Sequence, residues 1–169
     1  IAAVEEGRCI YNNIEKVLAY LLSCNLGELA LMFIAILFGF PPPLIAIHLL
    51  WINLVTDGLP ALALTLEPPE PGIMKRPPRG LKEPVLSLNR VFTIVSQGLL
   101  EATVTLTGFL AILWFNPDGL AEKELLEQAQ GTAFCVLVFS EILRSLSARS
   151  MHLNFWRVGA LRNPYLLGA

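Results

Sequence analysis

LIAIHLLWINLVTDGLPALALTL, from Leu44 to Leu66, has the length and the apolar character of a helix that crosses a membrane. About 20 such residues span the hydrocarbon core of a bilayer. The middle of this stretch nevertheless holds Asn53, Thr56 and Asp57. Their i, i+3, i+4 spacing predicts that the three side chains share one face of a helix. Polar groups at mid-membrane depth indicate a functional site inside a span.

The helix is expected to be interrupted directly after Asp57. Gly58 and Pro60 follow, and a proline has no N–H to donate to the carbonyl four residues earlier, here that of Thr56. Interrupted backbone is tolerated in a membrane only where protein buries it or where it lines a cavity, and transporters place their ion sites at such breaks. A carboxylate, an amide, a hydroxyl and a break so close together therefore predict an ion site.

Further apolar runs lie on both sides of this stretch. They predict spans at about 17–38, 91–115 and 129–146, in addition to 44–66, and the start of a truncated span at Tyr165. The residues before Val17 are polar, so the first helix is expected to continue beyond the membrane as a stalk. We therefore expect an all-α integral membrane protein: a polytopic helix bundle with a long, stalk-extended first helix and an unwound second helix.

The composition agrees with a membrane protein. Of the 169 residues, 54% are hydrophobic and only 15% are charged, whereas soluble domains carry about 25% charged residues. Neither the net charge of -2 nor any basic run indicates a nucleic-acid partner. The cysteines Cys9, Cys24 and Cys135 form no CxxC, which argues against a disulfide framework or a zinc site. The missing N-terminal Met leads us to expect a fragment of a longer protein.

Basic residues fall on alternate connections between the spans. Those after the second span are Lys75, Arg76, Arg79, Lys82 and Arg90, and those after the fourth are Arg144, Arg149, Arg157 and Arg162. The loop before the fourth span is acidic and contains Asp118, Glu122, Glu124 and Glu127. The positive-inside rule then places the basic segments in the cytosol, and the Pro41–Pro43 turn and the acidic loop outside.

Polar groups in the other spans are candidates for the same site. Asn25 and Glu28 lie three residues apart in the first span, and Glu141 lies in the fourth. Three ionised, unpaired carboxylates would cost roughly 8–10 kcal/mol in a membrane, so a cation, protonation or an arginine must compensate. All the ligand candidates offer oxygen, which suits a hard cation such as Ca²⁺ and disfavours zinc or copper. They are Asn25, Glu28, Asn53, Thr56, Asp57 and Glu141.

Several of these residues have structural alternatives. Asn25 can form an interhelical hydrogen bond, Pro60 can be a packing kink, and Glu141 can pair with Arg144 one turn further on. Packing or an interhelical contact is the simpler interpretation for three more polar residues: Cys24, His48 and Glu101.

The motifs resemble a known family over nearly the whole chain. EEGRCIYNNI, CNLGE, LLWINLVTDGLPALAL, KRPPR and KEP look like the last third of a P-type ATPase. The resemblance is closest to calcium pumps of the sarcoplasmic-reticulum type and their bacterial relatives, and the NLVTDGLPA core is its most specific part. Sodium/potassium-type pumps are similar but carry Asp at the position of Asn53, which favours the calcium type.

This resemblance implies that residues 1–169 are a fragment of the C-terminal transmembrane domain, with helices five to eight and the start of the ninth. The family's calcium ligands fall on the six candidate residues, and Asp57 would bridge two calcium sites. ATP and Mg²⁺ would bind outside this chain, which has no DKTGT motif and is not catalytic alone. Its partners would be calcium ions, lipid and the protein's own N-terminal helices and cytosolic domains.

The implied location is the bacterial plasma membrane or, alternatively, an endoplasmic-reticulum-type membrane, with protons countertransported against calcium. Arg144 departs from the family, whose animal pumps have a neutral residue there. Our hypothesis is that its guanidinium partly neutralises Glu141 and weakens or removes one calcium site. Other classes stay open: a channel or secondary transporter would need no stalk, and a structural module would not need carboxylates in its spans. Ca²⁺ and Mn²⁺ are not distinguished.

Overall fold

The computed structural model describes residues 2–69, 72–75, 84–116, 119, 121–149 and 163–168. Within these ranges all regular structure is helical. The elements are α1 (Ala2–Leu37), α2 (Ala46–Trp51), η1 (Ile52–Thr56), α3 (Gly58–Thr65), η2 (Ile73–Lys75), α4 (Leu88–Phe115), α5 (Glu122–Ala148) and α7 (Pro164–Gly168). Part of the charge prediction falls outside the described residues, at Arg76, Arg79, Lys82, Asp118, Arg157 and Arg162.

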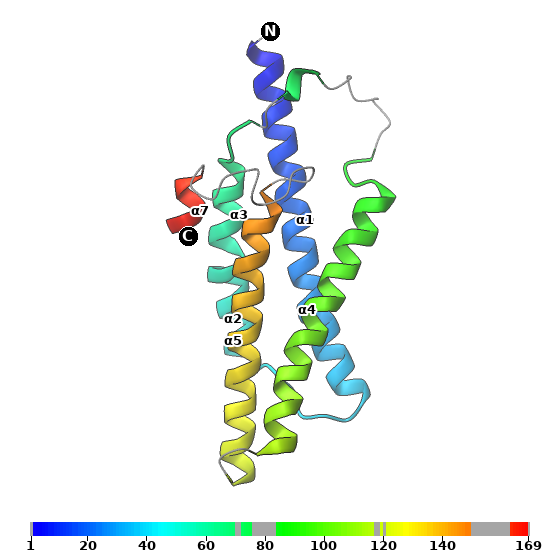
Figure 1. Ribbon diagram of the computed structural model, residues 1–169, viewed down its shortest axis with the longest axis vertical. Helices are drawn as coiled ribbons and strands as arrows, with labels where there is room; N and C mark the ends of the chain where they lie inside the picture. The colour runs from blue at the N-terminus through cyan, green and yellow to red at the C-terminus, as the bar shows by residue number, and fades with distance from the viewer. Residues whose placement is uncertain are drawn as a thin grey trace.

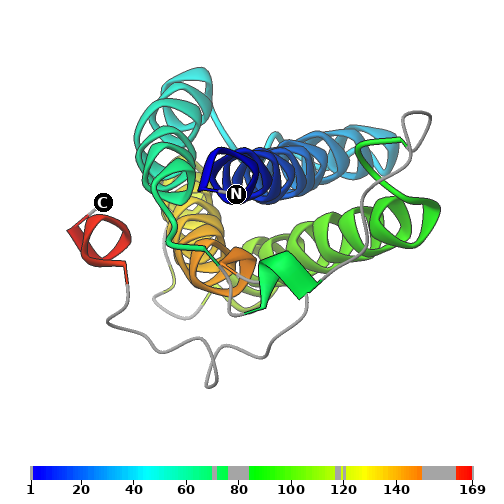
Figure 2. The ribbon, with the colours of Figure 1, turned by 90° about the horizontal axis from the view of Figure 1, so that it is seen from above.

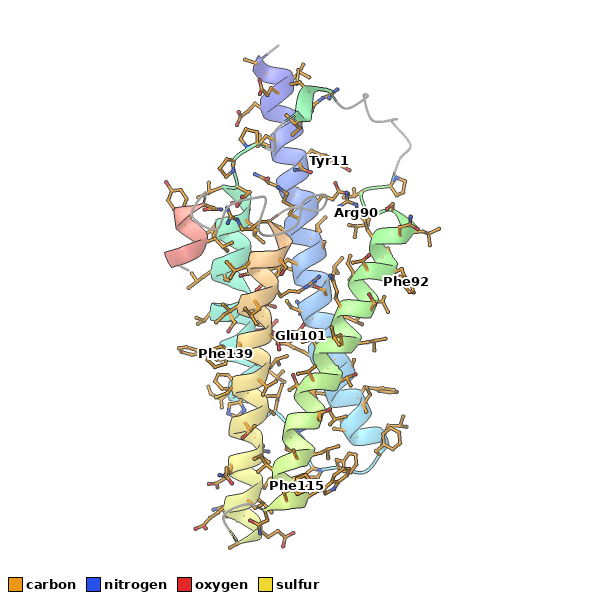
Figure 3. All side chains as sticks on the ribbon, in the orientation of Figure 1. Tyr11, Arg90, Phe92, Glu101, Phe115 and Phe139 are labelled. Atoms are coloured by element: carbon orange, nitrogen blue, oxygen red, sulfur yellow. The ribbon has the colours of Figure 1, made fainter. Side chains whose placement is uncertain are left out.

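Four helical segments are long and apolar enough to cross a membrane: Ala2–Leu37, Ala46–Thr65, Leu88–Phe115 and Glu122–Ala148. They stand side by side, with α1 packed between α4 and the α2–α3 segment, and with α5 closing the bundle (Figures 1 and 2). Large apolar side chains cover the outside. Phe92, Phe115 and Phe139 (Figure 3) are 75%, 81% and 66% exposed. Such a surface suits lipid rather than water, and the predicted all-α polytopic bundle is confirmed.

Helix α1 is longer than a membrane crossing requires. Its 36 residues extend over about 54 Å, against about 30 Å for the hydrocarbon core. The N-terminal part stands beyond the other long helices (Figure 1), and the chain after α3 packs on it. Arg8 Nη1 donates to the carbonyl of Ile73 at 3.0 Å, and Asn13 Nδ2 to that of Glu67 at 2.7 Å. The predicted stalk-like extension is therefore present.

Arginines gather at one end of the bundle, where Glu15 and Glu67 pair with two of them. The N-terminal part of α1, the start of α4 and the end of α5 lie together (Figure 1), and we call this the basic end after Arg90 and Arg149. Arg90 Nε lies 3.1 Å from Glu15 Oε1, which joins α4 to α1. The opposite end carries the acidic first turns of α5. This arrangement agrees with the alternating connections, and the cytosolic placement of the basic end stays a prediction.

A buried ion pair fastens three helices at the basic end. Arg149 Nη2, at the end of α5, lies 3.1 Å from Glu67 Oε1, just after α3, and the two side chains are 1% and 2% exposed. Asn163, before α7, donates to Glu67 Oε2 at 2.7 Å and to the carbonyl of Ala63 at 3.0 Å. Breaking such a pair by removing one charge is strongly destabilising, so Glu67 is a structural anchor.

Two glycines let α1 and α4 approach closely at mid-bundle. A Cβ at Gly98 would lie 2.8 Å from the carbonyl oxygen of Ser23, and a Cβ at Gly27 would lie 3.2 Å from Glu101 Oε2. Small residues are the usual means by which membrane helices come into backbone contact. The contact places the carboxylate of Glu101 directly against α1.

Candidate cation site

The predicted interruption of the second span is present, but it is a π-helical turn that ends just before Asp57 rather than unwound backbone after it. Helix α2 ends at Trp51, η1 covers Ile52–Thr56, and α3 begins at Gly58. The N–H of Asp57 donates to the carbonyl of Ile52, five residues earlier, at 2.9 Å. Single π turns of this kind occur frequently at functional sites. Asp57 therefore lies at the junction between two helical segments.

The carbonyl of Thr56 finds its hydrogen bond outside its own helix. Pro60 has no N–H to offer it, and the hydroxyl of Tyr20 on α1 donates to it at 2.9 Å instead. Tyr20 is 0% exposed, and a buried carbonyl needs such a partner. The break in the second span is thus stabilised by α1, and the bond holds α1 against η1.

Cys24, Asp57 and Glu141 form a compact buried cluster, contributed by α1, the η1–α3 junction and α5. One ligand atom from each lies within 4.8 Å of the other two. Cys24 and Glu141 are 0% exposed and Asp57 is 1% exposed. The oxygens of both carboxylates lack a hydrogen bond of regular geometry, although Tyr20 and Cys24 lie beside Asp57. Buried carboxylates need a compensating partner, and a bound cation would provide one.

Glu28 and Asn53 meet at the edge of this cluster. Asn53 Nδ2 donates to Glu28 Oε2 at 3.0 Å and to the carbonyl of Leu49 at 2.9 Å. The predicted common face of the second span is wrong in detail, because Thr56 and Asp57 are buried whereas Asn53 is exposed. The π turn holds one residue more than an α-helical turn, so i, i+3, i+4 spacing no longer gives a single face.

Asn25 uses its amide nitrogen within its own helix. Nδ2 donates to the carbonyl of Leu21 at 2.8 Å, which leaves the amide oxygen as the ligand atom. Thr56 Oγ1 is buried and lacks a hydrogen-bond partner. The roles of Asn25 and Thr56 as cation ligands stay predictions.

The structural alternative in which Glu141 pairs with Arg144 is wrong. Nε and Nη2 of Arg144 donate to Ser23 Oγ at 3.1 and 2.9 Å, whereas both carboxylate oxygens of Glu141 lack a hydrogen-bond partner. The guanidinium crosses to α1, where its charge interacts with Glu101 and Cys24. Glu141 therefore keeps both oxygens available for a cation.

His48 and Glu101 lie against neighbouring helices, and both carboxylate oxygens of Glu101 lack a hydrogen-bond partner. His48 packs its ring on Phe134 with the ring centroids 4.8 Å apart, as expected for a packed residue. Glu101 lies at mid-height of the bundle (Figure 3), is 6% exposed and contacts α1 at Gly27. This contact agrees with the predicted interhelical role.

Sequence reasoning missed two members of the site, Tyr20 and Cys24. Both were detectable in retrospect, because Tyr20, Cys24 and Glu28 follow each other at intervals of four residues. Side chains at that interval lie on the same face of a helix. Cysteine and tyrosine in an apolar run resemble ordinary packing residues. Of these three residues, only Glu28 was therefore selected from the sequence.

The helices and the buried carboxylates define a polytopic α-helical membrane protein with a polar centre inside its spans. The chain belongs to the cation-transporting ATPases, because the family model for the C-terminus of cation-transporting ATPases matches residues 41–169. The resemblance to P-type calcium pumps is thereby confirmed at the level of the family.

Two curated bacterial relatives align with almost the whole chain. Calcium-transporting ATPase 1 of Bacillus cereus is 42% identical over an alignment that covers 99% of this chain and 20% of the relative. Calcium-transporting ATPase of Bacillus subtilis is also 42% identical, over 99% of this chain and 18% of the relative. The chain thus spans about a fifth of the length of these relatives.

Proposed function

We propose that this chain is the ion-binding and ion-translocating part of an ATP-driven calcium pump of the bacterial plasma membrane. The observation that supports it most directly is the pair Asp57 and Glu141, buried without hydrogen bonds of regular geometry beside the π turn of the second span. The two relatives are named for calcium transport. ATP and Mg²⁺ would act in parts of the protein outside this chain.

The donor set is suited to a hard divalent cation. Asp57 and Glu141 supply the central carboxylates, and Glu28 supplies a third from the neighbouring turn of α1. Asn53 holds the Glu28 carboxylate in place through its amide nitrogen. The oxygens of Asn25 and Thr56 complete a set in which carboxylate, amide and hydroxyl oxygens dominate, as Ca²⁺ prefers.

We infer that protons replace the cation after its release. Two unit charges 4.8 Å apart, the greatest separation within the cluster, repel by about 3.5 kcal/mol at an effective dielectric constant of ~20. An empty site with both carboxylates ionised would therefore be unstable in a membrane. Taking up protons removes the repulsion and makes the return step a proton countertransport.

The test is ATP-dependent ⁴⁵Ca²⁺ uptake by inside-out vesicles that contain the full-length protein. Asp57→Asn and Glu141→Gln each remove one charge from the cluster and are expected to abolish uptake. Glu127→Gln is the matched control, because Glu127 lies on the same helix as Glu141 with a side chain 66% exposed. Uptake that survives both cluster substitutions would overturn the assignment of the site.

Wild-type vesicles without calcium uptake, whose ATP hydrolysis responds to another cation, would overturn the choice of ion. Proton countertransport has its own readout, namely alkalinisation of the vesicle interior that accompanies calcium uptake under a clamped membrane potential. Calcium uptake without any such pH change would contradict it.

A further inference from the structure

The cation cluster contains a sulfur atom where the proposed calcium function needs only oxygen. Cys24 Sγ lies with carboxylate oxygens of Asp57 and Glu141 in one group whose members are all within 4.8 Å of one another. We propose that Cys24 is a direct metal ligand, and that it lets the site bind thiophilic divalent cations such as Cd²⁺ and Zn²⁺ in competition with the transported ion. This inference rests on the proposed function only in sharing Asp57 and Glu141.

The geometry is close to that of a metal site. A point equidistant from three atoms spaced 4.8 Å apart lies about 2.8 Å from each, whereas Zn–S bonds are about 2.3 Å and Zn–O bonds about 2.0–2.2 Å long. Each ligand atom must therefore move inward by roughly half an ångström or slightly more, given bonds of that length.

The surroundings leave the two carboxylates in need of a cation. Asp57 and Glu141 are 1% and 0% exposed, and their oxygens lack hydrogen bonds of regular geometry, although Cys24 and Tyr20 lie beside Asp57. Cys24 is also 0% exposed, so a metal ion between the three would be out of contact with water on this side. Binding to the thiol displaces its proton, and the resulting thiolate is the sulfur species that metal ions bind.

The position of Cys24 is fixed by its neighbours on α1. One turn before it, Tyr20 is bonded to the carbonyl of Thr56, next to Asp57. The adjacent residue, Ser23, accepts two hydrogen bonds from Arg144. These bonds anchor the guanidinium of Arg144 on α1 at the residue next to Cys24. The thiol is therefore held between the cluster and a cationic side chain.

Sulfur changes which ions the site prefers. Carboxylate and carbonyl oxygens suit Mg²⁺, Ca²⁺ and Mn²⁺, whereas thiolates select softer ions, and zinc accepts a mixture of cysteine and carboxylate ligands. The Cys24–Asp57–Glu141 cluster is such a mixture. It is therefore expected to hold a borderline-soft divalent ion more tightly than the same site with oxygen in place of sulfur.

The experiment is inhibition of ATP-dependent ⁴⁵Ca²⁺ uptake by Cd²⁺ in vesicles that contain the full-length protein. Cys24→Ser keeps a small side chain but replaces the sulfur. Loss of an outer-shell partner already costs 10–100-fold in metal affinity, so loss of the ligand itself should raise the half-inhibitory Cd²⁺ concentration by at least about tenfold. The inhibition is expressed relative to the calcium uptake of each variant without Cd²⁺.

The chain provides its own matched controls. Cys135 is exposed on α5 and Cys9 lies in the stalk, so Cys135→Ser and Cys9→Ser should leave the inhibition by Cd²⁺ unchanged. Equal inhibition of the wild type and Cys24→Ser would overturn the proposal. So would a loss of inhibition that follows Cys135→Ser or Cys9→Ser instead.

Equilibrium binding of ¹⁰⁹Cd²⁺ to the same membranes separates this inference from the proposed function, because it needs no transport. High-affinity ¹⁰⁹Cd²⁺ binding that disappears in Cys24→Ser, accompanied by thiolate-to-metal charge-transfer absorption in the wild type, supports the ligand role even if calcium uptake fails. If Cys24→Ser does not accumulate, the wild type decides: Cd²⁺ binding without that absorption band overturns the proposal.

Discussion

The hydroxyl of Tyr20 and the carbonyl of Thr56 are joined by a 2.9 Å hydrogen bond across the interface between α1 and η1. Pro60 denies this carbonyl its helical donor, so a side chain on another helix replaces a backbone N–H. Pro60 interrupts the second span, and Tyr20 satisfies the carbonyl that the interruption leaves without a donor. The two residues are 40 positions apart in the chain.

Removing this hydroxyl tests how much the break depends on α1. Tyr20→Phe keeps the ring but leaves the Thr56 carbonyl buried and unbonded, which costs about 1–3 kcal/mol. We expect a lower thermal stability of the purified protein in detergent and weaker calcium binding. Tyr165→Phe is the control, because Tyr165 is 63% exposed. Equal stability of the two variants would show that water or another donor replaces Tyr20.

The buried pair of Arg149 and Glu67 should contribute far more to stability than a surface pair. Arg149→Gln leaves Glu67 as an uncompensated buried charge, which typically costs about 3–5 kcal/mol. The exposed Lys123–Glu127 pair, 3.9 Å apart, offers the comparison, since Lys123→Ala should change stability by no more than about 1 kcal/mol. Thermal unfolding in detergent measures both variants, and equal shifts would contradict the structural role.

A glycine inside the contact between α1 and α4 and a glycine outside it should respond in opposite ways to replacement by alanine. Gly98→Ala places a Cβ 2.8 Å from the carbonyl oxygen of Ser23, and such overpacking costs about 1–3 kcal/mol. Gly131→Ala on α5 meets nothing within 4 Å and should stabilise its helix by up to about 1 kcal/mol. Unfolding of the two variants should therefore shift in opposite directions, and a stabilised Gly98→Ala would refute the close approach.

Arg144 should oppose cation binding by its charge rather than by blocking Glu141. At an effective dielectric constant of ~20, a unit charge and a divalent cation repel by more than about 1.4 kcal/mol at any separation below about 20 Å. Arg144→Gln is therefore expected to tighten calcium binding by at least about tenfold. Equilibrium ⁴⁵Ca²⁺ binding gives both the affinity and the number of ions bound. Arg144→Lys keeps the charge and is the control, and the same tightening in that variant would contradict an electrostatic cause.

The sequence was sufficient to indicate four membrane-spanning helices, the extension of α1 and an interruption of the second span, because each depends on the local order of apolar, polar and proline residues. It also indicated both carboxylates of the cluster, since a charge in an apolar run is costly wherever it points. Partners across helices were not predictable in this way. The choice of Ser23 rather than Glu141 by Arg144 depends on how α5 is rotated against α1, which no local pattern records.

The π turn was not predictable for a related reason. Pro60 and Gly58 predict an interruption, but whether the chain opens, kinks or takes in an extra residue depends on the packing around Ile52–Thr56. The place of Cys24 in the cluster was not predictable from the sequence either, because a thiol in an apolar run looks like a small hydrophobic residue. Only the positions of Asp57 and Glu141 reveal it as a third member of the cluster.

The π turn places one more residue in the middle of the second span than a regular α-helical turn would hold. Closing η1 into regular α-helical hydrogen bonding would turn one half of the span against the other by about 100° and displace it by about 1.5 Å, the step of a single residue. Such a one-residue shift would change the directions in which Asn53 and Asp57 point relative to each other. The two halves of this helix can therefore shift against each other by one residue, without any change in the hydrogen bonding inside either half.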